Sequence, residues 1–449
     1  MRFVPVVASA GLASVALCTA APEAITQVRE PQMRVLLHEG DHVVLRADQT
    51  QLMTVRGLPG GTRQIRRLQL RRQGSGLMAV VDGQPRRLGA GTLLTVQNND
   101  PRGIWLGQRR YQGALRISGR GGRLRVVNAL GIETYLASVV GSEMPHQWPL
   151  AALQAQAVAA RTYALRQRSR GGGWDVKATV ASQVYRGLES VTPSTLEAVK
   201  TTHSLVLVHN GRLIDAVFHS SSGGITEASG MVWRRQHPYL VSVQDYDQHS
   251  PVHRWQERFD SLGLRQRLPE IGGVVGVDVL DRSSSGRVRQ VRLRGPRGSL
   301  VLKGTELRRR LGLKSTLVNF EMVASQQDVP QRLRALKSPA PVRSGSRIDL
   351  LTSSVAASVS RAPSRLLAPP PVLLPKRVRG QGMQLLVSGQ GFGHGVGMSQ
   401  WGAHGLAEQG ADFRSILLHY YRGAAVVPFR SHHDPGLASV PVLKPLWNS

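Results

Sequence analysis

The chain has 449 residues, and its 58 Lys and Arg residues against 28 Asp and Glu residues give a formal net charge of +30 at pH 7. Such an excess of positive charge indicates an anionic partner without identifying it. The single cysteine, Cys18, excludes an intrachain disulfide and a cysteine-based zinc site. An apolar fraction of 41% over this length is typical of a soluble protein with two or three domains.

The first twenty residues have the pattern of an export signal. Arg2 precedes the apolar run Phe3–Leu17, and Cys18-Thr19-Ala20 is a small-residue cleavage site. We therefore expect an exported protein of the periplasm or cell envelope. A retained membrane anchor is the alternative, although the apolar run is short for a span. Export, and the lack of a recognition motif, argue against nucleic acid as the anionic partner. Anionic surfaces of a cell envelope remain candidates.

Residues 30–127 predict a β-rich subdomain, because short apolar runs alternate with turns that contain Gly or Pro. No catalytic group of residues is visible here, and we expect a structural or glycan-facing role. The predicted strands are 33–37, 43–47, 52–55, 65–70, 77–81, 92–96, 113–118 and 124–127.

Two predicted helices flank the short segment Gly141–Pro145. Apolar residues at helical spacing predict the first helix over 131–140, and the Ala-rich run from Trp148 to about Arg170 predicts the second. Glu143 lies between them, in a predicted turn. It is either a capping residue for the second helix or a general acid/base whose pKa is raised by apolar cover. Composition alone favours the cap, since perturbed carboxylates are a minority.

The chain then continues with alternating helices and strands. A helix is predicted over 193–201, and Asn210-Gly211 predicts a hairpin between strands 205–208 and 214–218. The polar loop His219–Thr226 follows, but it lacks the Gly-x-Ser-x-Gly pattern of a serine-hydrolase elbow. The remaining predictions are strands at 277–280, 288–293, 300–303 and 319–323, and helices at 304–311 and 413–421.

Two further segments differ in composition from the rest. Residues 325–380 are rich in Pro and Ser and hold ten Lys or Arg residues against two acids, so we expect a flexible basic insertion. Residues 389–405 alternate glycine with other residues and hold His394 and Gln400. The Lys-Ser/Thr ending of a phosphate-binding loop is missing, so we predict a Gly-rich loop that approaches a ligand.

Several of these pieces occur together in an order that resembles the SpoIID/LytB family, which includes the stage II sporulation protein D and amidase-enhancer relatives. The resemblance covers about residues 128–425 and leaves out the basic insertion. The matching segments are 128–135, Ser142-Glu143-Met144-Pro145, 155–163, Ser182-Gln183-Val184-Tyr185, 218–224 and 393–400.

The resemblance implies lytic transglycosylase chemistry on peptidoglycan strands that lack stem peptides, with Glu143 as the catalytic acid/base. It implies an α+β fold of helices and antiparallel strands around a glycan-binding groove. Some family members bind zinc through a His and nearby cysteines, but this chain has serines at those positions, so we expect no metal and no cofactor. The implied substrate-binding residues are Arg161, Ser182, Gln183, Tyr185, His219, Ser221, His394, Ser399 and Gln400; a purely structural role, which for Arg161 would be an ion pair, remains open for each.

The predicted organisation is a signal peptide (1–20), a β-rich subdomain (30–127), a catalytic domain in two parts (128–324 and 381–429), the insertion (325–380) and a loose tail (430–449). The expected partners are peptidoglycan strands and a cell-wall amidase. Two alternatives to an enzyme stay open: a non-catalytic amidase enhancer that binds peptidoglycan, and an envelope protein in which the basic insertion binds an anion.

Overall fold

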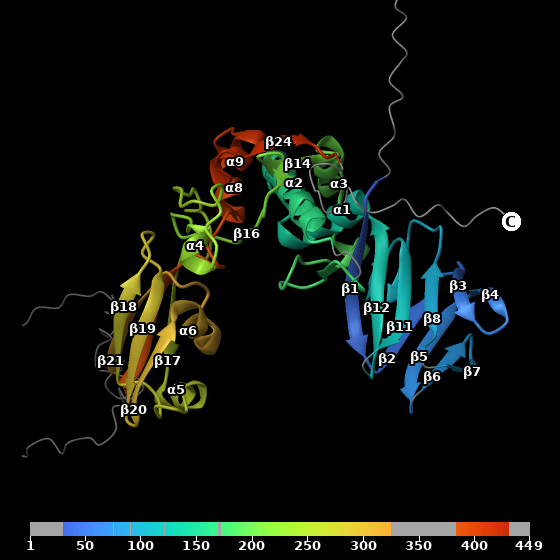
Figure 1. Cartoon of the computed structure of the whole chain (residues 1–449), viewed down its shortest axis with the longest axis horizontal. Helices are drawn as coiled ribbons and strands as arrows, with labels where there is room; N and C mark the ends of the chain where they lie inside the picture. The colour runs from blue at the N-terminus through green and yellow to red at the C-terminus, as the bar shows by residue number, and fades with distance from the viewer. Residues whose placement is uncertain are drawn as a thin grey trace, which may run out of the picture.

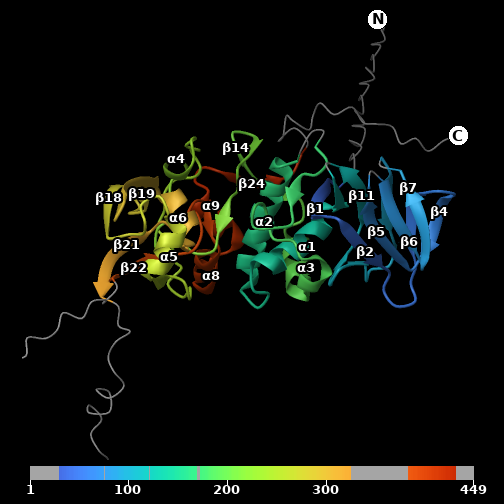
Figure 2. The same ribbon diagram turned by 90° about the horizontal axis from the view of Figure 1, so that it is seen from below.

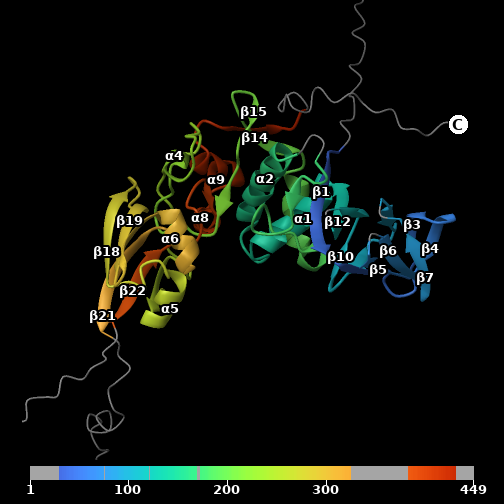
Figure 3. The same cartoon turned by 60° about the horizontal axis from the view of Figure 1, so that its bottom comes forward.

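The computed structural model describes residues 30–74, 76–89, 91–120, 122–168, 172–324 and 383–430. The fold is α+β, as predicted: a helical layer lies between two β-rich ends (Figure 1). The same order, β-rich end, helices, β-rich end, is visible after rotation (Figures 2 and 3). Among the described residues, no helix combines the length and apolar character that a membrane span requires.

The N-terminal end is built from two sheets, with strand orders β13-β1-β12-β11-β8-β3-β4 and β10-β9-β2-β5-β6-β7. Alternate side chains of these strands, such as Leu68 and Leu70, are buried between the sheets. The strands are β1 (Gln32–Gly40), β2 (His42–Arg46), β3 (Met53–Leu58), β4 (Gly61–Ile65), β5 (Arg67–Gln73), β6 (Gly76–Val81), β7 (Gln84–Leu88), β8 (Leu93–Gln97), β9 (Ile104–Leu106), β10 (Arg109–Tyr111), β11 (Ala114–Arg120), β12 (Arg123–Gly131) and β13 (Val176–Lys177).

The sequence prediction differs from this sheet pair in one boundary and four strands. The predicted strand 65–70 is divided, because β4 ends at Ile65 and β5 begins at Arg67. Strands β7, β9, β10 and β13 were not predicted. They are short, and β7 and β10 are rich in Arg, so pairing with a neighbour determines them rather than an apolar pattern.

Helix α2 (Leu150–Arg166) is the centre of the helical layer. Its many alanines are fully buried, and this lets α1 (Ile132–Glu143), α3 (Pro193–Thr201), α8 (Gln400–Glu408) and α9 (Phe413–Tyr420) pack closely around it. The 3₁₀ helix Gly187–Ser190 contacts α1. One apolar cluster runs from the two sheets into this layer. Helix α8 is a correction, because residues 389–405 were predicted to be a loop throughout.

The predicted hairpin is confirmed, but its second strand is shorter than expected. β14 (Leu205–His209) pairs with β15 (Arg212–Leu213) across Asn210-Gly211, where both residues have positive φ. The predicted second strand does not continue to residue 218, because β15 ends at Leu213. The next strand is β16 (Phe218–His219), which pairs in parallel with β23 (Met398–Ser399). On its other side, β14 pairs with β24 (Ala425–Pro428). Two different partners therefore divide one predicted strand.

The other β-rich end has an apolar cluster of its own, from Trp255 to Val387. Its sheets have the orders β17-β22-β21 and β18-β19-β20. The elements are α4 (Ser229–Val232), β17 (Arg254–Phe259), α5 (Ser261–Arg267), β18 (Gly276–Arg282), β19 (Val288–Gly295), β20 (Gly298–Lys303), α6 (Gly304–Leu311), β21 (Val318–Ala324) and β22 (Met383–Gln390). The predicted signal peptide, the basic insertion and nearly all of the predicted tail lie outside the described residues.

Candidate active site

Glu143 is the last residue of α1, whereas the sequence predicted that this helix ends at residue 140 and that Glu143 lies in the turn after it. The chain leaves the helix at Met144, whose N–H donates to the carbonyl of Val140 at 2.9 Å. The N-cap of the following helix is Pro149, and no side chain caps it. The capping interpretation of Glu143 is therefore wrong. At the negative end of the α1 dipole, a carboxylate is instead less stable when ionised.

Two hydrogen bonds hold the carboxylate of Glu143 in place. The backbone N–H of Val184 donates to Oε1 at 2.7 Å, and the side-chain amide of Gln400 donates to Oε2 at 3.3 Å. Burial nevertheless raises the pKa of Glu143 above the ordinary value, because it disfavours the charged form more than these bonds and the nearby Arg186 favour it. The carboxyl group is thus suited to carry a proton.

Glu143 faces a cleft of about 640 Å³, a volume in the range of small-ligand sites. The cleft lies between the helical layer and the second β-rich end, and it brings together five of the ten predicted site residues: Glu143, Ser182, His219, His394 and Gln400. The other residues that line it are Tyr163, Val180, Ala181, Val217, Phe218, Ser220, Trp233, Arg308, Phe392 and Gly393.

The parallel pair β16–β23 brings the His219 loop against the Gly-rich loop, although about 175 residues separate them in sequence. The rings of His219 and His394 lie 5.4 Å apart. Gly393 permits this approach, since an added Cβ would lie 2.7 Å from the Cβ of His219. The close approach seen here is to another segment of the chain, and the predicted approach of this loop to a ligand stays a prediction.

Both histidines are neutral at pH 7. Burial lowers the pKa of His219 far below its usual value and, with the charge of Arg308, lowers the pKa of His394 to about 4. The Nδ1 atom of His394 lies 3.0 Å from the N–H of Val396, which donates to it, so the proton of the neutral ring is on Nε2. The pair therefore presents neutral ring surface to a ligand, and no charge.

Gln183 and Tyr185 do not line the cleft. Both are buried: the Tyr135 hydroxyl donates to Gln183 at 2.9 Å, Gln183 donates to the carbonyl of Ala160 at 3.2 Å, and the Tyr185 hydroxyl donates to Asn128 at 2.8 Å. These bonds fix the residues on either side of Val184. The two side chains thus hold in place the backbone N–H of Val184, which binds Glu143, without contacting the cleft themselves.

The other three predicted residues also bind protein groups. Arg161 is 1% exposed and forms an ion pair with Glu133, with N–O distances of 2.9 and 2.6 Å, as its structural alternative predicted. The hydroxyl of Ser221 donates to Asp247. Ser399 is the N-cap of α8, accepting from the N–H of Gly402 at 3.1 Å, and so fixes the helix turn that carries Gln400.

Sequence reasoning missed four residues that shape the cleft: Tyr163, Trp233, Arg308 and Phe392. Trp233 is 40% and Phe392 45% exposed, and the Trp233 ring lies 5.4 Å from His394. Exposed aromatic rings in a cleft are suited to stacking on a ligand. The signal for Phe392 was its position between glycines. Arg308 was hidden in a run of three arginines, of which only it lines the cleft.

Arg308 is a half-buried cation without an acidic partner among the described residues. Its Nε donates to the carbonyl of Leu313 at 3.2 Å, and burial alone lowers its pKa. By contrast, its neighbours Arg309 and Arg310 both pair with Glu306. Leaving a cation half-buried without a counter-charge is costly. The guanidinium therefore provides a place for an anionic group of a ligand in the cleft.

A family model described as "Stage II sporulation protein" matches residues 120–209, which include α1, Glu143 and the Val184 loop. The amidase enhancer of Bacillus subtilis (strain 168) is 32% identical over 301 residues, covering 66% of this chain and 40% of that protein. The stage II sporulation protein D of the same organism is 28% identical over 319 residues, covering 67% of this chain and 75% of that protein. The chain belongs to the SpoIID/LytB family.

A third relative, an uncharacterized protein of Brachyspira hyodysenteriae (strain ATCC 49526 / WA1), is 27% identical over 330 residues, covering 73% of this chain and 75% of that protein. This member of the SpoIID/LytB family spans less than half the length of the amidase enhancer. The family-model match includes Glu143, Tyr163 and Ser182. It does not reach Trp233, Arg308 or Phe392, which contribute other walls of the cleft.

Proposed function

We propose that this chain is a lytic transglycosylase that cleaves peptidoglycan glycan strands lacking stem peptides and leaves 1,6-anhydro-muramic ends. The observation that carries the proposal is the environment of Glu143. It is the one Asp or Glu among the described residues that line the 640 Å³ cleft, and its pKa is raised. The names of the relatives, stage II sporulation protein D and amidase enhancer, support a role in the cell wall.

In this reaction Glu143 first donates a proton and then accepts another one. We place the proton on Oε2, because the bond that it accepts from the Gln400 amide, at 3.3 Å, is longer than the 2.7 Å bond that Oε1 accepts from the backbone N–H of Val184. Oε2 protonates the oxygen of the glycosidic bond, and the bond breaks to leave an oxocarbenium-like centre at C1 of the muramic acid. The C6 hydroxyl of the same sugar attacks C1 and returns its proton to the carboxylate. Atoms balance without water, and the enzyme is restored.

The presence of a single carboxylate favours this route over hydrolysis. A hydrolase needs a second carboxylate, either to activate water or to form a glycosyl-enzyme, and the two must lie within about 10 Å of each other across the bond. Glu133 is on the same helix but is occupied by Arg161, and about three turns of helix separate it from Glu143. An internal hydroxyl nucleophile needs only the one group that is present.

Arg308 explains why a strand without stem peptides would be preferred. Removing a stem peptide leaves a free lactyl carboxylate on muramic acid, where an intact strand has an amide. A half-buried guanidinium without a protein counter-charge would bind this carboxylate with charge-assisted hydrogen bonds. An amidase would therefore act on the strand first and supply the substrate of this chain. In this sense a cell-wall amidase would be its partner. Both reactions would take place outside the cytoplasm.

The decisive measurement is mass spectrometry of amidase-treated peptidoglycan incubated with the wild-type chain, with Glu143→Gln and with Glu408→Gln. Glu408 is an exposed carboxylate on α8, so its variant is the matched control. We expect 1,6-anhydro products, which carry one water less than hydrolysis products, from the wild type and the control. General acid–base catalysis is worth about 100- to 10,000-fold, and Glu143→Gln should lose this much.

The pH dependence of kcat/KM provides a second test of the role of Glu143. Glu143 must be protonated to start the reaction, so kcat/KM should fall as pH rises through its raised pKa. If Glu143→Gln retained the full yield of anhydro ends, the enzymatic proposal would fail. If no anhydro ends formed but the chain still stimulated an amidase, and did so equally with Glu143→Gln, the amidase-enhancer alternative would replace it.

A further inference from the structure

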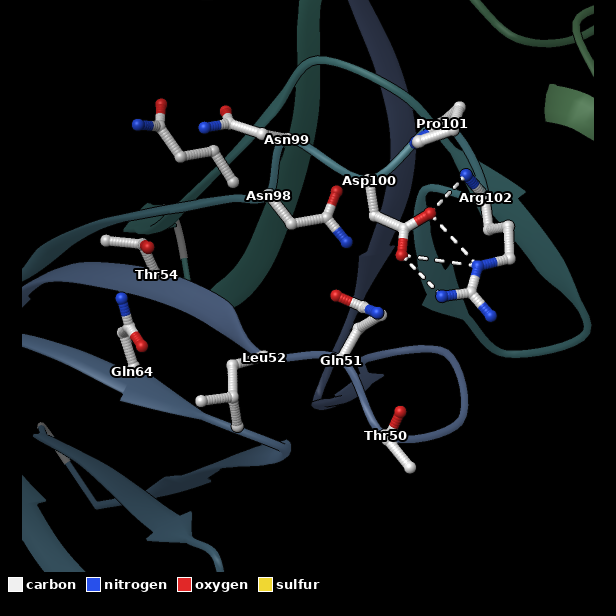
Figure 4. Close-up of a pocket in the computed structure, with 11 residues that line it drawn as sticks. Thr50, Gln51, Leu52, Thr54, Gln64, Asn98, Asn99, Asp100, Pro101 and Arg102 are labelled. Atoms are coloured by element: carbon white, nitrogen blue, oxygen red, sulfur yellow. Dashed lines mark hydrogen bonds and ion pairs between the residues drawn. The ribbon is translucent and has the colours of Figure 1, made fainter.

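The N-terminal sheets hold a second cleft, of about 800 Å³ (Figure 4). The strands β3, β4 and β8 that contribute to it lie at the end of these sheets away from α1 (Figure 1). The cleft lies where the loop after β2, strands β3 and β4, and the end of β8 meet. We call it the amide cleft, because five of the eleven residues that line it are Asn or Gln. Its lining is Thr50, Gln51, Leu52, Thr54, Gln64, Gln97, Asn98, Asn99, Asp100, Pro101 and Arg102.

The amides of the cleft have bonding capacity to spare. The side-chain N–H₂ of Asn98 donates to the carbonyl of Gly103 at 3.0 Å, whereas the side chains of Gln51, Gln64, Gln97 and Asn99 have no hydrogen-bond partner within the described part of the chain. Each amide carries two N–H donors and one carbonyl acceptor. Figure 4 shows Asn98 and Asn99 on one side of the hollow and Gln51 and Gln64 on the other.

The walls of the amide cleft are fixed by a network behind them. Arg102 forms a two-pronged ion pair with Asp100, with N–O distances of 2.7 to 3.2 Å (Figure 4). It also donates to the side chain of Gln49 at 2.7 Å. Asp48 accepts from the indole N–H of Trp105 at 2.9 Å. The Arg102–Gln49 bond joins the loop at 98–102 to the loop after β2, and the Trp105–Asp48 bond joins the latter loop to β9. A ligand would therefore meet a preformed site and lose little affinity to ordering it.

The charge of the amide cleft is unlike that of the whole molecule. Asp100 and Arg102 are its ionisable residues and they neutralise each other, in a chain with a net charge of +30. A site for a polyanion or a nucleic acid would present unpaired cations. The apolar residues are only Leu52, which is 41% exposed, and Pro101, which is too little for the mostly apolar lining of a drug-like or peptide site.

We propose that the amide cleft is a second carbohydrate-binding site, which takes an uncharged stretch of oligosaccharide and performs no chemistry. Neighbouring sugar hydroxyls and acetamido groups are each donor and acceptor, and this matches the free amides and the hydroxyls of Thr50 and Thr54. Leu52 supplies an apolar surface for the C–H face of a ring. The site would tether the chain to glycan while the cleft of Glu143 acts elsewhere, and two linked sites bind more tightly than either alone.

The test measures binding of chitotetraose, a neutral oligosaccharide with acetamido groups, by ligand-observed NMR titration. All chains carry Glu143→Gln in the full-length protein, so no cleavage interferes. The double variant Gln51→Glu/Gln97→Glu keeps the shape of the amide cleft but removes two donor groups. Gln84→Glu, on the exposed strand β7 of the same sheets, is the matched control. Trp233→Ala removes an aromatic wall of the other cleft.

We expect the double variant to bind chitotetraose about tenfold more weakly, since each lost hydrogen bond costs about 0.5–1.5 kcal/mol. The Gln84→Glu and Trp233→Ala chains should keep binding at the amide cleft. Equal affinity of the double variant and the Gln84→Glu control would overturn the proposal, as would an absence of binding by the control. Thermal melts of both variants should match, because the substituted side chains hold no structural bond.

The outcome is independent of the proposed enzymatic function. In a chain with Glu143 intact, Gln51→Glu/Gln97→Glu should cleave short soluble strands at the wild-type rate and be retained less on insoluble peptidoglycan. If Glu143 proved not to be catalytic, the binding result would stand by itself. If the double variant bound normally, the chemistry of Glu143 would be unaffected.

Discussion

Two carboxyl groups line the two clefts, and their surroundings have opposite effects. At Glu143, burial raises the pKa, and the neighbouring donors are an amide and one backbone N–H. At Asp100, the hydrogen bonds of Arg102 hold the pKa below its usual value. A carboxyl group that must lend a proton needs an environment that favours its neutral form, whereas one that stiffens a binding wall needs a fixed cation.

The same contrast applies to the two arginines nearest these sites. Arg102 is 35% exposed and paired, while Arg308 is half-buried without an acidic partner among the described residues. One cation therefore stabilises the protein and the other remains available to a ligand. Substitutions that change the free energy of unfolding without changing ligand binding, or the reverse, would sharpen this comparison.

The largest effect on stability should come from Arg161→Met, on helix α2 in the helical layer. Removing this arginine leaves Glu133 and the carbonyl of Leu205 without their partner, and breaking a buried ion pair costs about 3–5 kcal/mol. Urea denaturation followed by helical circular dichroism would measure the loss. Arg102→Met should cost much less, because solvent screens its pair.

A double variant distinguishes the cause of that loss. Arg161→Met/Glu133→Gln should recover part of the stability, since most of the cost is the charge left alone. If the single and double variants were equally unstable, packing of the arginine stem would be the main contribution, and the ion pair would be secondary.

Arg308→Ala should raise the KM for strands without stem peptides by about 10- to 100-fold and change kcat little. The reason is that a hydrogen bond to a charged group is worth about 1.5–3 kcal/mol. Arg309→Ala, on the same helix but paired with Glu306 at the surface, is the control. The comparison substrate is the same strand with its lactyl carboxylates chemically amidated. Amidation should impair the wild type and leave Arg308→Ala unaffected.

If amidation impaired both proteins equally, some other cation would bind the carboxylate. The salt dependence offers an independent check, because binding through Arg308 should weaken as ionic strength rises, and binding of a neutral sugar at the amide cleft should not.

The smallest effect is a loss of stability in acid that arises from His394 in the cleft of Glu143. The pKa of His394 is lowered to about 4 in the folded chain, so between pH 6.5 and 4 the unfolded chain binds more protons and stability falls as pH falls. For this residue the loss between pH 7 and pH 5 should be about 2 kcal/mol. His394→Gln should flatten the pH dependence of the urea midpoint over this range, and an unchanged pH dependence would contradict the prediction.

Much of the fold followed from local pattern. Helix α6 was predicted with both its ends and α3 with its bounds, because α3 begins with a Thr192 cap and Pro193, and α6 ends at Gly312 in the left-handed conformation. Strands β9 and β10 and helix α8 were missed. Their residues lack an apolar period, and pairing or packing with distant segments determines their structure.

The candidate site was predictable as a set of segments and not as a set of contacts. Glu143, Ser182, His219, His394 and Gln400 do meet at one cleft. The other five predicted residues bind protein groups and hold those segments in place. Gln183, for example, anchors the loop that presents an N–H to Glu143.

The sequence alone determined the family motifs, the candidate acid, the charge excess and the run of helices and strands, because these depend on residues close together along the chain. Only the tertiary structure decided that Glu143 ends a helix and is buried enough for its pKa to rise, and that Arg308 faces the cleft while Arg309 does not. It also decided that the amides of 51, 64 and 97–99 meet in one hollow. Desolvation and convergence depend on segments brought together from distant parts of the chain, and no local pattern records them.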